Sequence, residues 1–324
     1  QGNVALDAAR IILKGRKALE TTDITNQALD LLDTSTINEI HIFGRRGPAQ
    51  ASFTNKELRE MFEIDDCQVY IAKEDLTELN EASQLEIKSS RTHKRMLALM
   101  KKKGTLISKE EMIQAISNTR NEKTHKKCFI HFNMSPVEYI ASPQDPNHVQ
   151  EVALEKTVLS GPANAQRAKG TGEISKLQDC GIILESIGYF PIPIGGVPFQ
   201  NGIVMHSEGR IVDANQTPME GLYASGWFKR GSNGIIGTNV WDAQETSRAL
   251  ISDLQGGQIP LTNRQPFYNG ITDLLEERKL LSKVSTWEDW KNIETAEEKR
   301  GAEQQPPKPR EKFLSASEMN KVRQ

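Results

Sequence analysis

Gly2-Asn3-Val4-Ala5-Leu6-Asp7, at the start of the chain, is the stretch that decides the fold. Apolar residues recur after it at helical spacing as far as about residue 19, so a helix begins directly after a glycine. The first N–H groups of a helix have no partner within the helix and carry the positive end of its dipole, so this position suits a pyrophosphate. Taken alone, the stretch leaves open an ordinary tight turn before a helix.

The chain opens inside this motif. The strand and the first glycine of a complete G-x-G-x-x-G/A fingerprint would lie before residue 1, and the chain begins with Gln1 rather than methionine. We therefore expect the sequence to be the later part of a longer polypeptide.

The pattern that follows alternates helices and strands, which is typical of an α/β fold. Residues 25–33 predict a helix, residues 37–43 a strand and residues 53–61 another helix, in which Thr54 and Glu57 have the spacing of a capping box. Further expected helices cover residues 90–104, 109–118 and 242–254, and further expected strands cover residues 128–132, 149–159, 180–187 and 209–213. The charged tail beyond about residue 285 is expected to wrap the surface of a domain.

Arg45 and Arg46 follow the strand over residues 37–43, in the glycine-hinged turn Gly44-Arg-Arg-Gly47. In a dinucleotide fold the second strand ends beside the adenine ribose, where an acidic residue binds a free 2′-hydroxyl and arginines accommodate a 2′-phosphate. Two guanidinium groups can make bidentate contacts with a phosphate. A solvated basic turn is the alternative for these two residues alone, but together with the glycine before the first helix they favour NADP over NAD.

A second glycine-rich segment, GLYASGWFKRGSNGIIGTN, runs from Gly221 to Asn239. A strand that ends in Ala-Ser-Gly, a glycine-rich turn and a helix would place backbone N–H groups against a cofactor. Gly234 and Gly237 permit the close approach of a flat ring, on which Trp227 could stack. The alternative is a glycine-rich connection with a tryptophan in the core.

The composition excludes several classes of protein. The 324 residues include 41 basic and 43 acidic side chains, and this net charge of −2 argues against bulk nucleic-acid binding. No run approaches the roughly 18 apolar residues that span a bilayer. The three cysteines form no C-x-x-C pair, which fits a reducing compartment. His125 and His131 lack convincing metal-ligand spacing, so no metal site is expected.

Five segments together resemble one family, the mitochondrial NADPH:adrenodoxin (ferredoxin) oxidoreductases. They are GNVALDAARIIL from Gly2, GRRGPAQASFTNKELREM from Gly44, SIGY from Ser186, GLYASGWFKRG from Gly221 and KPREK from Lys308. The resemblance covers essentially the whole chain, in order. It implies an α/β protein with two dinucleotide-binding, Rossmann-like domains. Residues 1–185 would be the NADP-binding domain without its first strand, inserted in an FAD-binding domain of which residues 186–324, with the surface-wrapping tail, form the C-terminal part.

The resemblance also implies cofactor-binding residues, although it assigns no catalytic residue. Those at NADP would be Gly2, Asn3 and Val4 at the pyrophosphate, Arg45 and Arg46 at the 2′-phosphate, and Glu57 at the ribose or the nicotinamide side. Those where FAD and NADP meet would be Trp227 and Gly234, with Gly234, Ile235 and Ile236 along the flavin.

The implied function is that of a flavoprotein oxidoreductase. It would pass electrons from NADPH through FAD to a 2Fe–2S ferredoxin of the adrenodoxin type, which feeds mitochondrial monooxygenases and iron–sulfur cluster assembly. Without a C-x-x-C pair, electrons cannot leave through an internal disulfide and must pass to an external acceptor. The resemblance places the protein in the mitochondrial matrix, with no transmembrane segment and at most peripheral to the inner membrane.

Basic residues offer a surface for the acidic ferredoxin. Arg59, Arg91 and Arg95 match positions that the family uses for docking. Arg91 also begins a Lys- and Arg-rich stretch that extends to Lys103, and such a stretch attracts an acidic partner in a salt-dependent way. A solvated helix face is the alternative for this stretch.

Two departures from the family pattern bear on the flavin. The family's Pro-Thr pair after Arg-Gly is Ser232-Asn233 here, which removes a stiff position from that loop. The N-terminal FAD segment, with its own glycine-rich phosphate loop, is also absent from the sequence, so we expect this polypeptide alone to bind FAD poorly. Two other functions stay open: an FAD-free NADPH-binding scaffold or sensor, and an NADPH flavoprotein that feeds a different acceptor, like the small subunit of glutamate synthase.

Overall fold

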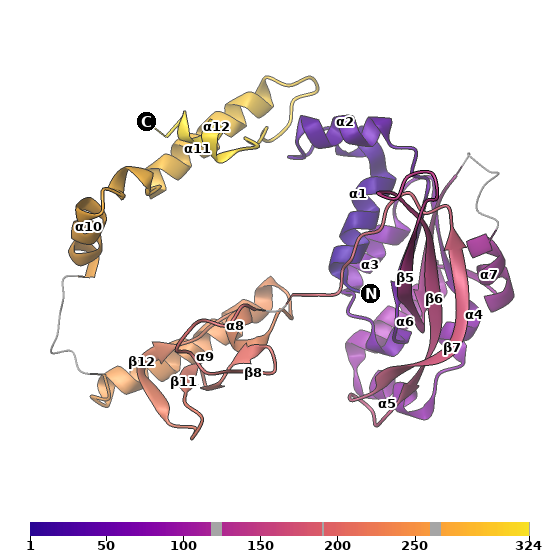
Figure 1. The fold of residues 1–324 in the computed structure, drawn as a ribbon, viewed down its shortest axis with the longest axis horizontal. Helices are drawn as coiled ribbons and strands as arrows, with labels where there is room; N and C mark the ends of the chain where they lie inside the picture. The colour runs from indigo at the N-terminus through magenta and orange to yellow at the C-terminus, as the bar shows by residue number, and fades with distance from the viewer. Residues whose placement is uncertain (118–124, 190, 260–266, 324) are drawn as a thin grey trace. The chain divides into compact units, whose positions relative to one another are not determined.

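The computed structural model describes residues 1–117, 125–189, 191–259 and 267–323. Its contacts divide the chain into unit 1, residues 1–186 with 286–324, and unit 2, residues 187–285 (Figure 1). Each unit has its own hydrophobic clusters. The predicted α/β fold is confirmed. The assignment of residues 1–185 to NADP and of residues 186–324 to FAD stays a prediction.

The centre of unit 1 is a four-stranded parallel sheet with the strand order β1-β4-β2-β3. Its strands are β1 (Glu39–Gly44), β2 (Cys67–Ala72), β3 (Thr105–Ile107) and β4 (Lys126–Phe132). β4 lies between β1 and β2, and its residues from Cys128 to Phe132 are all buried. Such a continuous buried run is expected of a parallel strand that is covered on both faces.

Helices on one face of this sheet supply most of the core of unit 1 (Figure 1). The helices of the unit before residue 118 are α1 (Asn3–Leu19), α2 (Asn26–Thr34), α3 (Asn55–Phe62), α4 (Lys73–Thr77), α5 (Glu81–Ser89), α6 (Arg91–Lys103) and α7 (Lys109–Ser117). Leu13 of α1, Met61 of α3 and Met100 of α6 are each 0% exposed and pack in one cluster with Ile71 and Ile130 of the sheet. Each such side chain contributes roughly 1.5–3 kcal/mol through its burial.

The other face of the parallel sheet packs partly against a second, antiparallel sheet. Its strands β5 (Met134–Ala141), β6 (Val149–Ser160) and β7 (Arg167–Gln178) lie in that order. The contact is made by Phe43 of β1, which packs against Val152 and Leu154 of β6. The loops at the carboxyl ends of β1 and β4 therefore lie beside this second sheet.

The predicted strand over residues 180–187 is wrong, because that segment belongs to no strand. Two contacts nevertheless hold the segment to the second sheet. The Cys180 N–H donates to the Gln150 carbonyl at 2.9 Å, and Ile183 packs against the cluster around Val152. The strand that pairs with β6 on the side away from β5 is β7, which lies before residue 180 and is polar and glycine-containing.

The C-terminal tail belongs to unit 1 and carries α11 (Trp287–Ala302) and α12 (Ala316–Asn320). Lys308, the first residue of the KPREK segment, donates from Nζ to the Ile24 carbonyl at 2.8 Å and to Asn26 Oδ1 at 2.9 Å. The Asn26 N–H in turn donates to Glu311 Oε1 at 3.2 Å. The KPREK segment thus fixes the tail to the start of α2.

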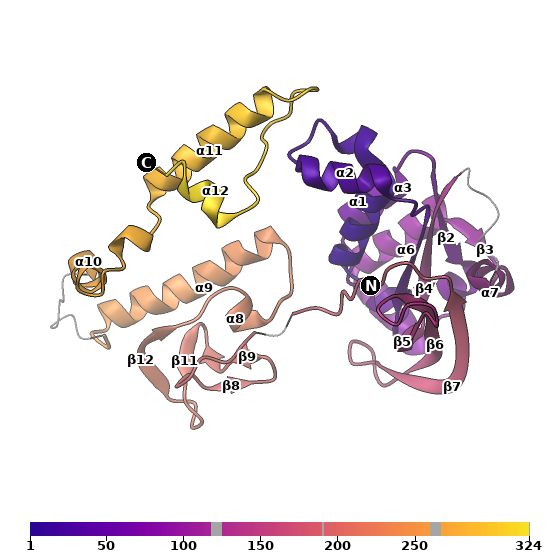
Figure 2. The same ribbon diagram turned by 45° about the horizontal axis from the view of Figure 1, so that its top comes forward.

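Unit 2 combines short antiparallel strands with one long helix. The strands are β8 (Phe199–Gln200), β9 (Ile203–Val204), β10 (His206–Ser207), β11 (Arg210–Val212) and β12 (Pro218–Tyr223), and the helices are α8 (Trp227–Arg230), α9 (Ile236–Gln255) and α10 (Phe267–Glu277). Figure 2 shows α9 running alongside β11 and β12. The helix predicted over residues 242–254 is confirmed, but it begins earlier, at Ile236. Across the described ranges of both units, no helix combines the length and the apolar character needed to cross a membrane.

Candidate functional site

The helix α1 begins at the carboxyl-end edge of the parallel sheet. Gly2 precedes it in extended conformation (φ −146°, ψ 176°) and provides no side-chain cap. A Cβ added to Gly2 would meet no atom within 4 Å, so the space beside it is open. Gly2 also forms a parallel bridge with Ser52, a few residues after the turn that follows β1. The free N–H groups of the first turn of α1, at Asn3 and Val4, are therefore held close to that turn.

Asn3 takes the place of Glu57 in the capping box predicted at the start of α3. Its Oδ1 accepts a hydrogen bond from the Thr54 backbone N–H at 2.8 Å. In a capping box the Glu57 carboxylate would take that N–H, and Thr54 would cap α3 with its hydroxyl. Thr54 does precede α3, but it makes no side-chain cap, so the predicted capping box is wrong. Consequently Glu57 Oε2 is buried with no hydrogen-bond partner among the described residues, which leaves it available to a ligand.

The turn with Arg45 and Arg46 is held through its backbone. The Thr157 hydroxyl of β6 donates to the Arg45 carbonyl at 2.7 Å, and the Asn133 N–H donates to the Arg46 carbonyl at 3.2 Å. Both arginine side chains are exposed. The second sheet thus fixes the turn and leaves two guanidinium groups free to point toward an anion.

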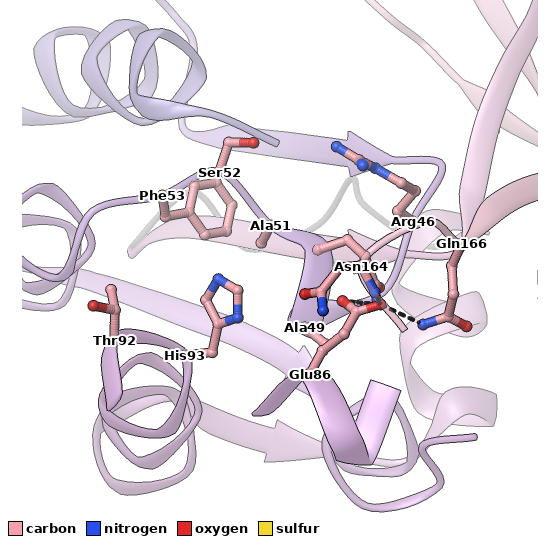
Figure 3. Close-up of a pocket in the computed structure, with 11 residues that line it drawn as sticks. Arg46, Ala49, Ala51, Ser52, Phe53, Glu86, Thr92, His93, Asn164 and Gln166 are labelled. Carbon is pink, nitrogen blue, oxygen red and sulfur yellow. Dashed lines mark hydrogen bonds between the residues drawn. The ribbon is translucent and has the colours of Figure 1, made fainter. Parts of the chain in front are cut away.

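A cavity of about 380 Å³ lies beside Arg46 (Figure 3). Its lining comes from four parts of unit 1: Arg46, Ala49, Gln50, Ala51, Ser52 and Phe53 after β1, Glu86 of α5, Thr92 and His93 of α6, and Asn164 and Gln166 before β7. The volume is in the range of small-molecule sites.

Glu86 organises one wall of this cavity, as Figure 3 shows. It is buried, and its Oε1 accepts hydrogen bonds from Gln166 Nε2 at 2.9 Å and from the Asn164 N–H at 2.8 Å, while its Oε2 accepts one from Gln50 Nε2 at 2.8 Å. In contrast, Gln50 Oε1 and His93 Nδ1 are buried and unpaired among the described residues. Such unpaired atoms are costly in an empty pocket and indicate that polar groups of a ligand or water belong there.

The predicted pyrophosphate, 2′-phosphate and ribose residues are therefore brought to one edge of one sheet, where they can hold a dinucleotide. The cavity wall was not predicted, because Glu86 and His93 lie in a charged helical stretch whose pattern carries no sign of a pocket. Gln50 could have been singled out, since it lies in the GRRGPAQ segment.

The second glycine-rich segment, from Gly221 to Asn239, lies in unit 2. Trp227 is 50% exposed, so it is not a core tryptophan of that unit, and its ring stacks on Tyr189 with centroids 5.8 Å apart. Gly234 has a φ of +95°, and a Cβ there would lie 2.7 Å from Thr238 Oγ1, so only glycine fits. Ile235 and Ile236, at the start of α9, are exposed.

A buried ion pair that was not predicted supports this segment. Lys229 Nζ lies 3.2 Å from Asp242 Oδ1, and both side chains are buried. Asp242 also accepts a hydrogen bond from the Gly226 N–H, directly before Trp227. Although burial raises the pKa of Asp242, the bond from Gly226 and the Lys229 ammonium outweigh it and lower that pKa below its ordinary value. The segment around Trp227 is thus tied to α9.

The predicted docking residues are exposed on two neighbouring helices. Arg59 lies on α3, and Arg91 and Arg95 lie one turn apart on α6. The two helices pack together through Met61 and Met96.

The cysteines offer no reactive thiol at neutral pH. Burial raises the pKa of Cys67 to about 11, and burial also raises the pKa of Cys128 and Cys180. Among the residues that the structure describes, no three His, Cys, Asp or Glu side chains gather to hold a metal ion.

The chain is similar to named oxidoreductases along almost its whole length. A protein of Arabidopsis thaliana named NADPH:adrenodoxin oxidoreductase, mitochondrial, is 36% identical over 323 residues, which cover 97% of this chain and 63% of that protein. The protein of the same name in Rattus norvegicus is 38% identical, and the match covers 98% of this chain and 61% of that protein. The solved structure of Mycobacterium tuberculosis FprA in complex with NADPH superposes with a TM-score of 0.80 at 30% identity, over 99% of this chain and 66% of that one. No family model matches the chain.

Proposed function

The chain is a homologue of the NADPH:adrenodoxin oxidoreductases along almost its whole length, and we propose that it serves NADPH-dependent electron transfer through FAD to a 2Fe–2S ferredoxin. It spans about three fifths of the length of the curated relatives that it matches. We place this function in mitochondria, and more narrowly in the matrix, where the reduced ferredoxin would feed monooxygenases and iron–sulfur cluster assembly.

The observation that carries the proposal is the edge of unit 1 at which α1 begins. The N–H groups of Asn3 and Val4, after Gly2, would bind the pyrophosphate of NADPH. Arg45 and Arg46 would bind the 2′-phosphate, with the adenosine end in the cavity that Arg46 lines.

Glu57 completes the proposed NADPH site. Its buried, unpaired Oε2 can accept a hydrogen bond from a hydroxyl of the ribose or from the nicotinamide side. An isolated buried carboxylate is costly, so a donor from the ligand would stabilise it. A carboxylate repels an anion placed next to it but pairs with an uncharged hydroxyl, so this contact favours a nucleotide over free phosphate.

The segment from Gly226 to Ile236 would contact the flavin. Gly234 permits a close approach by a flat ring, Trp227 offers an exposed aromatic face, and the exposed Ile235 and Ile236 offer apolar contact. When bound, NADPH and FAD supply the hydride and single-electron chemistry, for which amino-acid side chains are unsuited. The chain's own part is to bind these groups and to exclude water from them.

The electrons would leave to an acidic ferredoxin that docks on α3 and α6. Arg59, Arg91 and Arg95 give this surface a positive charge, which speeds the encounter with a negatively charged partner at low salt. Since the thiols of this chain are held protonated, a cysteine pair is not the exit route.

The proposal is tested in two steps. Calorimetric titration of the purified chain with NADPH and NADH measures the nucleotide site, and we expect NADPH to bind far more tightly. Reduction of cytochrome c by NADPH, with FAD added and with or without a 2Fe–2S ferredoxin, then measures electron transfer. Because this polypeptide alone is expected to bind FAD poorly, the added FAD is in large excess over the chain. Under that condition we expect turnover that depends on both FAD and the ferredoxin.

The other functions predict different results. NADPH binding without turnover under any of these conditions would favour the FAD-free scaffold or sensor. Turnover that needs FAD but is indifferent to ferredoxin would favour a flavoprotein with another acceptor. Equal affinity for NADPH and NADH would contradict the proposed site itself.

A further inference from the structure

The loop of unit 2 after Arg230 carries a tether that depends on Ser232. The hydroxyl of Ser232 donates a hydrogen bond of 2.9 Å to the backbone carbonyl of Tyr189. This is the position at which the resemblance leads one to expect proline, a residue without a hydroxyl. In this chain, therefore, the stiffness that proline would give the loop is replaced by a bond to a different segment, 43 residues earlier.

The tethered residue forms half of an aromatic pair. The rings of Tyr189 and Trp227 are stacked, with centroids 5.8 Å apart and planes inclined by 22°. Tyr189 is 63% exposed and Trp227 is 50% exposed, so the pair lies at the surface of unit 2 rather than in its core. Because Tyr189 covers only part of the indole, aromatic surface of Trp227 stays free for another flat ring.

The two halves of the pair are held unequally. On the Trp227 side, Asp242 accepts the Gly226 N–H, and the buried Lys229 ties α8 to α9. On the Tyr189 side, the preceding residue is Gly188, which has a φ of +103°. Glycine restricts the backbone less than any other residue. The Ser232 hydroxyl supplies a hydrogen bond that fixes this side. The Ser232 hydroxyl therefore restrains the backbone that carries the Tyr189 ring.

We infer that Tyr189 and Trp227 form one aromatic platform for the isoalloxazine ring of the flavin, and that Ser232 is the positioning residue that sets its geometry. The inference deepens the proposed function and rests on it, since Tyr189 was not among the residues expected at the flavin. Aromatic pairs prefer offset stacking, so a planar ring laid on Trp227 gains most when Tyr189 keeps the indole in a fixed orientation.

The test observes Trp227 directly and does not require turnover. The full chain is labelled with 5-fluorotryptophan, and the ¹⁹F resonance of Trp227 is assigned by its loss in Trp227→Phe. Without ligand, Ser232→Ala is expected to shift that resonance, whereas Ser232→Thr, which keeps a hydroxyl, restores it. Ser207→Ala, at an exposed serine of the same unit, is the matched control and is expected to leave the resonance in place.

Titration of the same samples with FAD then measures the platform. We expect FAD to shift the Trp227 resonance and Ser232→Ala to raise the concentration at half-shift by about fivefold, as for the loss of one hydrogen bond. Tyr189→Ala should match that loss, whereas Tyr189→Phe should retain binding because it keeps the ring.

Failure of the inference and failure of the proposed function are distinguishable. If FAD shifts Trp227 but Ser232→Ala behaves as the unaltered chain in both measurements, the positioning role is wrong. If FAD leaves the Trp227 resonance of the unaltered chain unchanged, the flavin site is wrong, and the platform with it. In that case the ligand-free spectra of the Ser232 variants still decide whether the tether exists.

Discussion

The side-chain oxygen of Asn3 accepts a hydrogen bond from the backbone N–H of Thr54, with 2.8 Å between the two atoms. This bond joins the starts of α1 and α3, which lie 51 residues apart in the chain. It also occupies the N–H that Glu57 would take in a capping box. Glu57 Oε2, at the proposed nucleotide site, is buried with no hydrogen-bond partner among the described residues. Asn3 thus couples the two positions that we propose for the pyrophosphate and the ribose.

Two substitutions of Asn3 separate these roles. Asn3→Ala removes the acceptor, so the free energy of unfolding should fall by about 1 kcal/mol, and Glu57 becomes free to turn back to Thr54. Asn3→Asp keeps an acceptor and places a negative charge in the first turn of α1, which helix dipoles favour, so stability should be retained. The same charge repels a pyrophosphate. Urea unfolding and NADPH titration measure both effects, and an Asn3→Asp chain with unchanged NADPH affinity would show that the pyrophosphate lies elsewhere.

The specificity for the 2′-phosphate is expected to depend on the turn after β1. Arg45→Ala combined with Arg46→Ala removes two charged donors, each worth about 1.5–3 kcal/mol to a phosphate. The dissociation constant of NADPH should therefore rise at least about a hundredfold, while that of NADH changes little. Lys169→Ala, at an exposed lysine of β7, is the control for a lost positive charge. Equal losses for NADPH and NADH would mean that these arginines do not bind the 2′-phosphate.

The parts of the proposed nucleotide site differ in how far the sequence could predict them. The edge with Gly2 and Arg45 could be predicted, because glycine, helix start and charged turn are local patterns whose place in a parallel sheet follows from topology. The resemblance placed Glu57 at the ribose or nicotinamide side, which stays a prediction. The capping box predicted for it is wrong, because the Thr54 N–H donates to Asn3, which is remote in the chain. The cavity wall around Glu86 was not predicted for the same reason, because its hydrogen bonds join three distant segments of the chain.

The fold shows the same limit. Some strands with apolar periodicity, such as β4, were predicted within two residues of their observed bounds. The strands β2 and β5 were not predicted. The strand β7 was missed because its sequence, RAKGTGEISKLQ, is polar and its residues are mostly exposed. The residues from 180 to 187 have the apolar composition of a strand but form none, and Ile182, Leu184 and Ile187 are exposed. A short apolar run alone therefore does not predict a strand.

Gly234 and Gly237 form a matched pair for testing the flavin loop. At Gly234 a methyl group would lie 2.7 Å from Thr238 Oγ1 on a backbone with φ of +95°, so Gly234→Ala should distort the loop at a cost of roughly 1–3 kcal/mol and weaken FAD binding. At Gly237, a helical position with open space, alanine should be neutral or stabilise by up to about 1 kcal/mol. Thermal unfolding and flavin fluorescence compare the two. If Gly237→Ala weakens FAD binding more than Gly234→Ala, close approach at Gly234 is not what the loop requires.

The Lys229–Asp242 pair is expected to make stability depend on pH. The pKa of Asp242 is lower in the folded chain than its ordinary value of 3.8, so its stabilising contribution is complete above about pH 4 and is lost as the pH falls through the folded pKa. Asp242→Asn should reduce stability at pH 7 by about 1–3 kcal/mol, since the buried Lys229 loses its buried carboxylate partner. Among the described residues it keeps the exposed Glu245 carboxylate and the uncharged Thr246 hydroxyl. The difference between variant and unaltered chain should shrink at pH 3. Urea unfolding at both pH values measures this, and a difference that grows on acidification would contradict the assigned direction.

The docking of ferredoxin should respond to charge on α6 rather than to the charge of the whole chain. Arg95→Glu reverses one charge on the proposed surface, and Lys169→Glu reverses one charge on β7. Because the encounter is steered electrostatically, Arg95→Glu should slow the association of an acidic 2Fe–2S ferredoxin about tenfold at low salt, measured by surface plasmon resonance. The effect should largely disappear above roughly 0.2 M salt, where the Debye length is shorter than about 8 Å. Lys169→Glu changes the net charge of the chain equally. Equal slowing by both variants would therefore show that association depends on net charge alone, and would contradict a docking site on α6.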